Sequence, residues 1–175
     1  MRHIIIYILS LVFLFSCNQG KDNTSSKAAL TDKEDILKVK IEFKTNIKDE
    51  FIIALNEIEI DEFQRMYIQA REIIPVTSNY DYMTVNFFEN MFSKKLEIRL
   101  GDRHPKQVEI KSISISKGVN NIFIEREQIK EFFNGNKYVS FDDKMKITTK
   151  EVDGRHLPVI YANTRLINLL KSSSL

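Results

Sequence analysis

Cysteine, tryptophan, glycine and proline are scarce in this chain of 175 residues. Its single cysteine confines thiol chemistry to one position, and its 5 glycines include no Gly-rich loop of the kind that cradles nucleotide phosphates. With 3 prolines and 43% hydrophobic residues, the chain is neither collagen-like nor broadly disordered. Tryptophan is absent, but 12 Phe and 6 Tyr can build a sizeable core, so we expect one folded domain.

Neither sign of charge is in large excess, because 26 Lys and Arg residues oppose 24 Asp and Glu residues. A net charge of +2 spread along the chain gives no concentrated basic field for a phosphate backbone. Nucleic acid is therefore not an expected partner.

Catalytic motifs are also missing from the sequence. No Gly-x-Ser-x-Gly motif occurs, and His104 and His156 have no partner at metal-ligand spacing. The acidic pair Asp142-Asp143 falls at a turn-like position, where turn chemistry explains it. We therefore expect a protein that is not an enzyme and holds no metal ion or cofactor. A glycosidase stays open as a less favoured alternative, because it needs only two carboxylates that the fold brings together.

The first residues have the pattern of a signal peptide. Arg2 and His3 precede an apolar run, residues 4–16, that is too short to cross a hydrocarbon core about 30 Å thick. The run ends in Leu14-Phe15-Ser16-Cys17, which resembles the lipobox of bacterial lipoproteins, with Phe15 in place of the usual small residue. This resemblance implies cleavage after residue 16, acylation of Cys17 and a lipid anchor in the outer or inner membrane, facing the periplasm or the exterior. An ordinary secretory signal is the alternative.

Residues 17–35 contain few apolar side chains and no periodicity, which is typical of a flexible tether. If Cys17 is acylated, the mature protein has no free thiol. That excludes thiol catalysis, disulfides and cysteine metal sites. The folded domain is expected to comprise residues 36–175.

From residue 36 onward the dominant hydrophobic period is two. Leu37, Val39 and Ile41 alternate with charged residues, as expected for a strand with one buried face. Ten strand-like runs occur, at residues 37–44, 51–60, 65–70, 82–88, 95–100, 108–116, 121–125, 138–141, 144–152 and 157–161.

Three local features within and between these runs predict further details of the fold. The apolar parity of residues 108–116 changes between Ile110 and Ile113, which indicates a β-bulge or a strand buried on both faces. Residues 45–49 are expected to form a hairpin loop, and Asp153-Gly154 is expected to form a two-residue hairpin turn.

Helical spacing is found in two segments. Residues 125–133 predict one short helix that ends at Asn134-Gly135, and residues 164–171 fit either a helix or a strand. Ten strands with almost no helix predict a mostly β fold. We expect a two-layer antiparallel β-sandwich, jelly-roll-like, with one or two short helices.

One stretch resembles a known group of domains. Residues 96–101 (LEIRLG), a polar loop with Pro105, and residues 108–116 followed by Gly118 resemble the paired strands of galactose-binding-like and other carbohydrate-binding β-sandwiches. The resemblance covers a small part of the chain. It implies a jelly roll that binds sugar on a concave face or on edge loops. Such sites commonly use tryptophan, which this chain lacks.

Two clusters combine groups suited to binding a ligand. Tyr80-Asp81-Tyr82 places aromatic rings and a carboxylate near the start of a strand. The second cluster follows a strand and offers guanidinium groups to a carboxylate or a hydroxyl pair. Its residues are Arg99, Asp102, Arg103 and His104. We predict that a ligand contacts both clusters together, although a solvated loop explains the same residues without a ligand.

The expected function is a lipid-anchored, non-catalytic binding module of the cell envelope. Its expected partners are the membrane, through the anchor, and a glycan or another envelope component. The alternative is an envelope assembly or adaptor protein that docks another protein through a sheet edge or an apolar patch.

Overall fold

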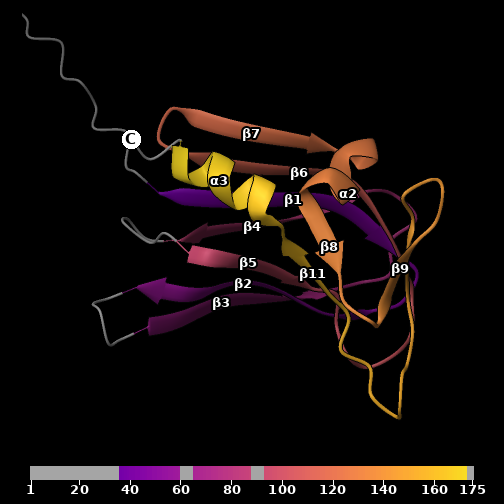
Figure 1. The fold of residues 1–175 in the computed structure, drawn as a ribbon. Coiled ribbons are helices and arrows are strands. Elements are labelled where there is room, and N and C mark those ends of the chain that lie inside the picture. The colour runs from indigo at the N-terminus through magenta and orange to yellow at the C-terminus, as the bar shows by residue number, and fades with distance from the viewer. Residues whose placement is uncertain (1–35, 60–64, 88–92, 173–175) are drawn as a thin grey trace, which may run out of the picture. The chain divides into compact units, whose positions relative to one another are not determined.

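The computed structural model describes residues 36–59, 65–87 and 93–172. Within these residues the strands form two antiparallel sheets, of six and five strands, and helix is confined to short segments. Figure 1 shows β1, β4, β6 and β7 side by side, and β2, β3 and β5 side by side. The predicted mostly β, two-layer sandwich is confirmed.

The first sheet, called the β1 sheet, has the order β4-β1-β6-β10-β9, and β7 also pairs with β6. Its strands are β1 (Leu37–Thr45), β4 (Asp81–Phe87), β6 (Gln107–Lys117), β7 (Asn120–Glu125), β9 (Val139–Phe141) and β10 (Ile147–Thr149).

The second sheet, called the β2 sheet, has the order β3-β2-β5-β11-β8. Its strands are β2 (Asp49–Glu59), β3 (Arg65–Ile74), β5 (Ser93–Arg99), β8 (Phe133–Gly135) and β11 (Val159–Ala162). The helical segments are the 3-10 helix η2 (Arg126–Gln128), α2 (Ile129–Phe132) and α3 (Thr164–Ser172).

The apolar faces of the two sheets form a common core. Successive side chains of a strand point to opposite faces, so in β1 Val39 is buried while Lys40 is exposed. Ile53 of β2 joins the same buried cluster. Phe43 of β1 and Phe51 of β2 stack with ring centroids 5.0 Å apart. Packing between the inner faces therefore leaves the two outer faces as the surfaces on which a site can form.

The predicted bulge in β6 is confirmed. Where β6 pairs with β1, Glu42 lies opposite Ser112 but Phe43 lies opposite Ile110. Lys111 is therefore the extra residue of the bulge. The insertion exchanges inward and outward positions between the two halves of β6, which is the parity change visible in the sequence.

Residues 45–49 do not form the predicted hairpin loop. They lead from β1 in one sheet to β2 in the other, and β1 pairs with β4 and β6 instead. β5 and β6, which cover the segments of the carbohydrate-binding resemblance, also lie in opposite sheets and do not pair with each other. Alternation marks one buried face for each strand but does not identify its neighbour.

The tight turn at Asp153-Gly154 is confirmed, although a single bridge rather than two strands flanks it. Asp153 and Gly154 have φ of 52° and 68°, as a type I′ turn requires. Val152 and Arg155 exchange two backbone hydrogen bonds, of 2.9 and 3.1 Å. Of the predicted strand at residues 144–152, β10 takes up residues 147–149.

The short helix predicted at residues 125–133 is confirmed with changed bounds, and the segment that fitted either a helix or a strand is helical. η2 and α2 occupy residues 126–132, and the chain continues directly into β8, a strand that the sequence did not predict. α3 shows that residues 164–171 are helical. The Asn163 side chain accepts a hydrogen bond from the backbone N–H of Leu166 (3.2 Å), which satisfies one free donor at the start of the helix.

Several sequence predictions lie outside the described residues. They are the signal peptide at residues 1–16, lipidation of Cys17 and the tether to residue 35, together with the strand ends at Ile60 and Phe88. In the part of the chain that the structure describes, no helix is long and apolar enough to cross a membrane.

Candidate functional site

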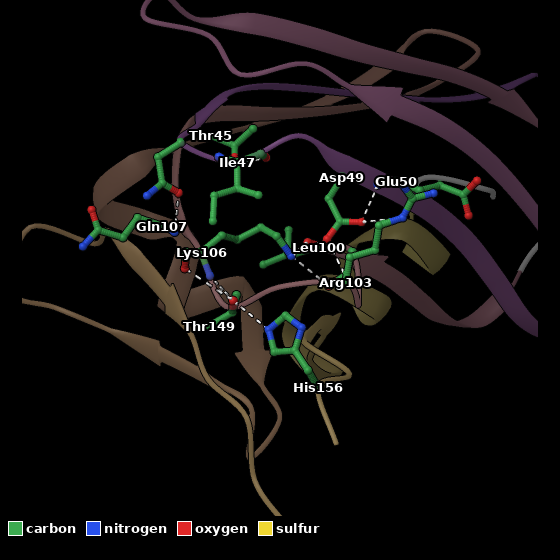
Figure 2. Close-up of polar contacts among 12 residues, drawn as sticks. Thr45, Ile47, Asp49, Glu50, Leu100, Arg103, Lys106, Gln107, Thr149 and His156 are labelled. Atoms are coloured by element: carbon green, nitrogen blue, oxygen red, sulfur yellow. Dashed lines mark hydrogen bonds and ion pairs between the residues drawn. The ribbon is translucent and has the colours of Figure 1, made fainter. Parts of the chain in front are cut away.

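A buried ion pair ties together two of the connections that cross between the sheets, the one from β1 to β2 and the one from β5 to β6. Lys106 Nζ lies 2.7 Å from Asp49 Oδ2, and neither side chain has exposed surface. Lys106 Nζ also donates hydrogen bonds to the carbonyl oxygens of Leu100 (3.0 Å) and Gly101 (3.1 Å). Figure 2 shows the lysine reaching toward Asp49 and Leu100. Three acceptors thus match the three donors of the ammonium group.

The carboxylate of Asp49 has further donors around it. The backbone N–H of Glu50 donates to Oδ1 (2.7 Å), and that of Arg103 donates to Oδ2 (3.1 Å). Burial raises the pKa of the Asp49 carboxyl, but Lys106 and these N–H groups outweigh burial and hold the pKa below its ordinary value. Burial lowers the pKa of the Lys106 ammonium by more than Asp49 raises it. The pair is therefore held as an ion pair by a complete set of contacts.

The same connection is fixed to β10 through a hydroxyl. The backbone N–H of Lys106 donates to Thr149 Oγ1 (2.8 Å), and that hydroxyl donates to the carbonyl oxygen of Lys106 (3.3 Å). His156 Nε2 lies 2.9 Å from Thr149 Oγ1. Figure 2 marks this contact with a dashed line. Together these contacts form a rigid buried network, which we call the Asp49 network.

Low pH should remove the stability that the Asp49 network contributes, and the variant Asp49→Asn can show this. The pKa of Asp49 is lower in the folded state, so its stabilisation is present above the unfolded pKa of about 3.9 and is lost as pH falls through the folded pKa. Asp49→Asn is expected to be less stable than the wild type at pH 7, and the difference should shrink toward pH 2. Urea unfolding at a series of pH values measures this. A difference that stays constant over the whole range would contradict it.

A pocket of about 390 Å³ opens on the outer face of the β2 sheet, next to the Asp49 network. We call it the Arg99 pocket. Outward-facing positions of β2, β5 and β11 supply Ile52, Arg99 and Val159, which are register neighbours. The pocket is lined by Glu50, Ile52, Arg99, Gly101, Asp102, Asn136, Tyr138, Leu157, Pro158 and Val159. It therefore combines apolar surface, an aromatic ring, two carboxylates and a guanidinium group.

Arg99 is the positively charged side chain in the lining of this pocket. Its NH2 group donates to Glu97 Oε2 (3.1 Å), and its guanidinium lies 5.5 Å from the centre of the Tyr67 ring. Its Nε is buried and has no hydrogen-bond partner among the described residues. Two neighbours thus hold the guanidinium in place, while the Nε donor stays unused.

Asn136 fixes the opposite wall of the Arg99 pocket. Its Oδ1 accepts hydrogen bonds from the backbone N–H groups of Tyr138 (3.2 Å) and Val159 (3.3 Å), and its Nδ2 donates to the carbonyl oxygen of Leu157 (2.7 Å). The asparagine therefore holds the wall in shape and has little capacity left for a ligand.

A second hollow, of about 480 Å³, lies on the same outer face. It shares β5 and β11 with the Arg99 pocket and extends to α3. Glu97 and Tyr161 line it, and Glu97 is also the partner of Arg99. The outer face of the β2 sheet can thus contact a ligand longer than one small molecule.

The structure divides the predicted binding residues between two faces. Arg99 and Asp102 line the Arg99 pocket. Arg103 lies over the Asp49 network, with its Nε 3.9 Å from Asp49 Oδ1, and the neighbouring His104 is exposed. Tyr82 projects from β4 on the outer face of the other sheet. The two clusters are therefore not brought together on one surface.

The tyrosine cluster has contacts of its own on the β1 sheet. The Tyr80 hydroxyl donates to Glu109 (3.2 Å) and accepts a hydrogen bond from Arg126. Tyr82 is 60% exposed, with Lys40 Nζ 4.7 Å from its ring centre. The Asp81 carboxylate accepts a hydrogen bond from the backbone N–H of Tyr82 (2.8 Å).

Sequence reasoning missed most of the lining of the Arg99 pocket. Ile52, Asn136 and Leu157 come from three separate segments, and no local motif connects them. One signal was present for Ile52, which occupies an outward position of its strand where a polar residue is usual.

No protein-family model, curated protein or solved structure matches this chain. The functional inference therefore depends on the geometry of the site. Over residues 36–59, 65–87 and 93–172, no group of three or more His, Cys, Asp or Glu side chains is arranged to hold a metal ion.

Proposed function

We propose that this protein is a lipid-anchored, non-catalytic binding module of the cell envelope that holds a glycan on the outer face of its β2 sheet. The Arg99 pocket carries this proposal. There a positioned guanidinium with an unused donor stands beside carboxylates, apolar side chains and a tyrosine ring.

The chemistry of sugars matches this combination. A sugar ring presents C–H groups that pack on apolar and aromatic surface, and hydroxyl pairs that bond to carboxylates and guanidinium groups. Volumes of about 390 and 480 Å³ fall within the usual range for ligand sites. The charged side chains of the Arg99 pocket include both signs, which supports a ligand rich in hydroxyl groups over a strongly charged one.

Loss of the guanidinium should weaken glycan binding. Arg99→Met is expected to lower affinity roughly 10-fold or more, since a hydrogen bond to a charged group contributes about 1.5–3 kcal/mol. Screening the protein on a glycan array identifies the sugar, and calorimetry of wild type and variant measures the change. Arg155→Met is the matched control, because Arg155 is exposed in a turn outside the pocket lining. Equal affinity of Arg99→Met and wild type, with both folded, would remove the site from this face.

A second candidate function is docking of another envelope protein. Ile73, near the end of edge strand β3, is 57% exposed, and Val76 just beyond it is 59% exposed. Apolar side chains at a sheet edge favour contact with another chain. A protein that binds no glycan on the array but binds an envelope protein through β3 would favour this candidate.

The location of the protein depends on Cys17. If the Leu14-Phe15-Ser16-Cys17 motif is a lipobox, Cys17→Ala is expected to abolish incorporation of labelled fatty acid and leave the signal peptide uncut, because the acylated thiol is gone. Metabolic labelling in a bacterial host, with detection by fluorography, provides the measurement. Equal labelling of wild type and variant would show that the chain is not anchored through this residue.

A further inference from the structure

Another pocket lies where the β1–β2 and β5–β6 connections meet the β1 sheet. We call it the Thr77 pocket; its volume is about 230 Å³. Thr45 ends β1 and Gln107 begins β6, while Thr77 and Ser78 come from the connection between β3 and β4. The full lining is Lys44, Thr45, Asn46, Thr77, Ser78, Gln107, Glu109 and Lys146. Every one of these side chains is polar or charged.

Some of these polar groups are used to shape the pocket, but the Thr77 hydroxyl is not. The Thr45 hydroxyl donates to the carbonyl oxygen of Ile47 (3.1 Å), and Asn46 Oδ1 accepts from the backbone N–H of Gln107 (2.8 Å). Thr77 Oγ1 is buried and has no partner among the described residues. An unpaired buried hydroxyl is unfavourable, and rotation about the Cα–Cβ bond can change where it points. The hydroxyl is thus available to a group that enters the pocket.

Positive charge is in excess at this pocket. Lys44 Nζ lies 3.1 Å, Arg126 NH2 3.9 Å and Lys146 Nζ 4.0 Å from the carboxylate oxygens of Glu109. One carboxylate cannot neutralise three cations. The Tyr80 ring lies beside this group, with its centre 5.2 Å from Lys44 Nζ, and its hydroxyl donates to the same carboxylate. Tyr80 thereby keeps the cations close together.

Glu109 is ionised, but its single negative charge offsets only one of the three positive charges around it. Burial raises its pKa, but Lys44, the Tyr80 hydroxyl and Arg126 outweigh burial and bring the pKa below its ordinary value. The carboxylate is therefore ionised and already engaged by its neighbours at neutral pH. A second anion can be accommodated by the remaining positive charge.

We propose that the Thr77 pocket binds a phosphate or sulfate group. A tetrahedral oxyanion offers acceptors alone, so it matches ammonium groups from Lys44 and Lys146 and hydroxyl donors from Thr77 and Ser78. The volume admits such a group with little of the molecule that carries it. The proposal is independent of glycan binding on the β2 sheet, because the two pockets share no lining residue.

The test titrates the full chain with sodium sulfate and with sodium phosphate, followed by NMR, at an ionic strength kept constant with sodium chloride. Saturable shifts of the Thr77 and Gln107 amides are expected. Lys146→Met should weaken binding about 10-fold or more, and Thr77→Val about three- to 10-fold. Thr77→Ser keeps the hydroxyl and should bind like the wild type. Lys48→Met removes the same charge from an exposed position outside the pocket and should leave binding unchanged.

The outcomes separate a site from a general charge effect. No saturable binding of either anion, equal binding by Thr77→Val and Thr77→Ser, or equal weakening by Lys48→Met and Lys146→Met would each overturn the proposal. Because Thr77 Oγ1 has no hydrogen-bond partner to lose in the part of the chain that the structure describes, Thr77→Val should unfold at the same or a higher temperature than the wild type. Glucose 6-phosphate and vesicles containing phosphatidylglycerol then distinguish a sugar ester from a lipid headgroup as the source of the group. Tighter binding of either carrier than of inorganic phosphate identifies that source.

Discussion

Gly101→Ala is expected to destabilise the sandwich by about 3 kcal/mol or more, although it adds a single methyl group. Gly101 has φ of +78°, a conformation that costs an L-residue about 1–2 kcal/mol. In addition, a Cβ atom there would lie 2.3 Å from Asp49 Cγ. The Asp49 carboxylate cannot move away from the added methyl group, because Lys106 and two backbone N–H groups hold it in place. Overpacking a rigid core typically costs a further 1–3 kcal/mol, roughly.

Gly154→Ala separates the two contributions. Gly154 has a similar φ of +68°, but nothing lies within 4 Å of a Cβ added there. It should therefore show the conformational cost alone, about 1–2 kcal/mol. Chemical denaturation of the two variants and the wild type gives both values. Equal losses for the two glycines would show that Asp49 does not press on residue 101.

Asp49→Ala is expected to cost about 3–5 kcal/mol, because it leaves the Lys106 ammonium buried without its carboxylate. The backbone N–H groups of Glu50 and Arg103 also lose their acceptor. A change at a solvated ion pair would cost roughly 1 kcal/mol or less. The size of the loss, measured by urea unfolding, therefore reports whether the pair is buried in solution.

A double variant tests the origin of that loss. Adding Lys106→Met to Asp49→Ala removes the orphaned charge, and replacing a buried pair by apolar side chains is often nearly neutral. We expect the double variant to be more stable than Asp49→Ala. If instead the stability losses of the single variants Asp49→Ala and Lys106→Met add up in the double variant, the instability comes from lost packing and not from an uncompensated charge.

The sequence predicted those features that depend on one strand at a time. Alternation located most strands, and the parity change in residues 108–116 located the bulge at Lys111. It could not assign strands to sheets, because each strand shows which of its faces is buried but not which strand lies beside it. That is why residues 45–49 were predicted to close a hairpin, whereas they cross between the sheets.

The candidate site was harder to predict for a related reason. Arg99 and Asp102 were found because they lie close together in the sequence, at and just after the end of β5, whereas Glu50, Tyr138 and Leu157 reach the pocket from other parts of the chain. Ionic residues are rarely buried completely, so Asp49 and Lys106 had the sequence pattern of ordinary surface residues. Tertiary structure alone brings them together.

The pairing of β1 has a consequence for how the chain acquires its structure. β1 lies between β4 and β6, and Leu37 pairs with Phe87 on one side and Lys117 on the other. Such long-range pairing is slow to form, because a long loop must close before any contact stabilises it. During that interval both edges of β1 are exposed to other chains. Lys38, Lys40 and Lys44 on its outer face give the waiting strand a repulsive charge that opposes aggregation at this stage.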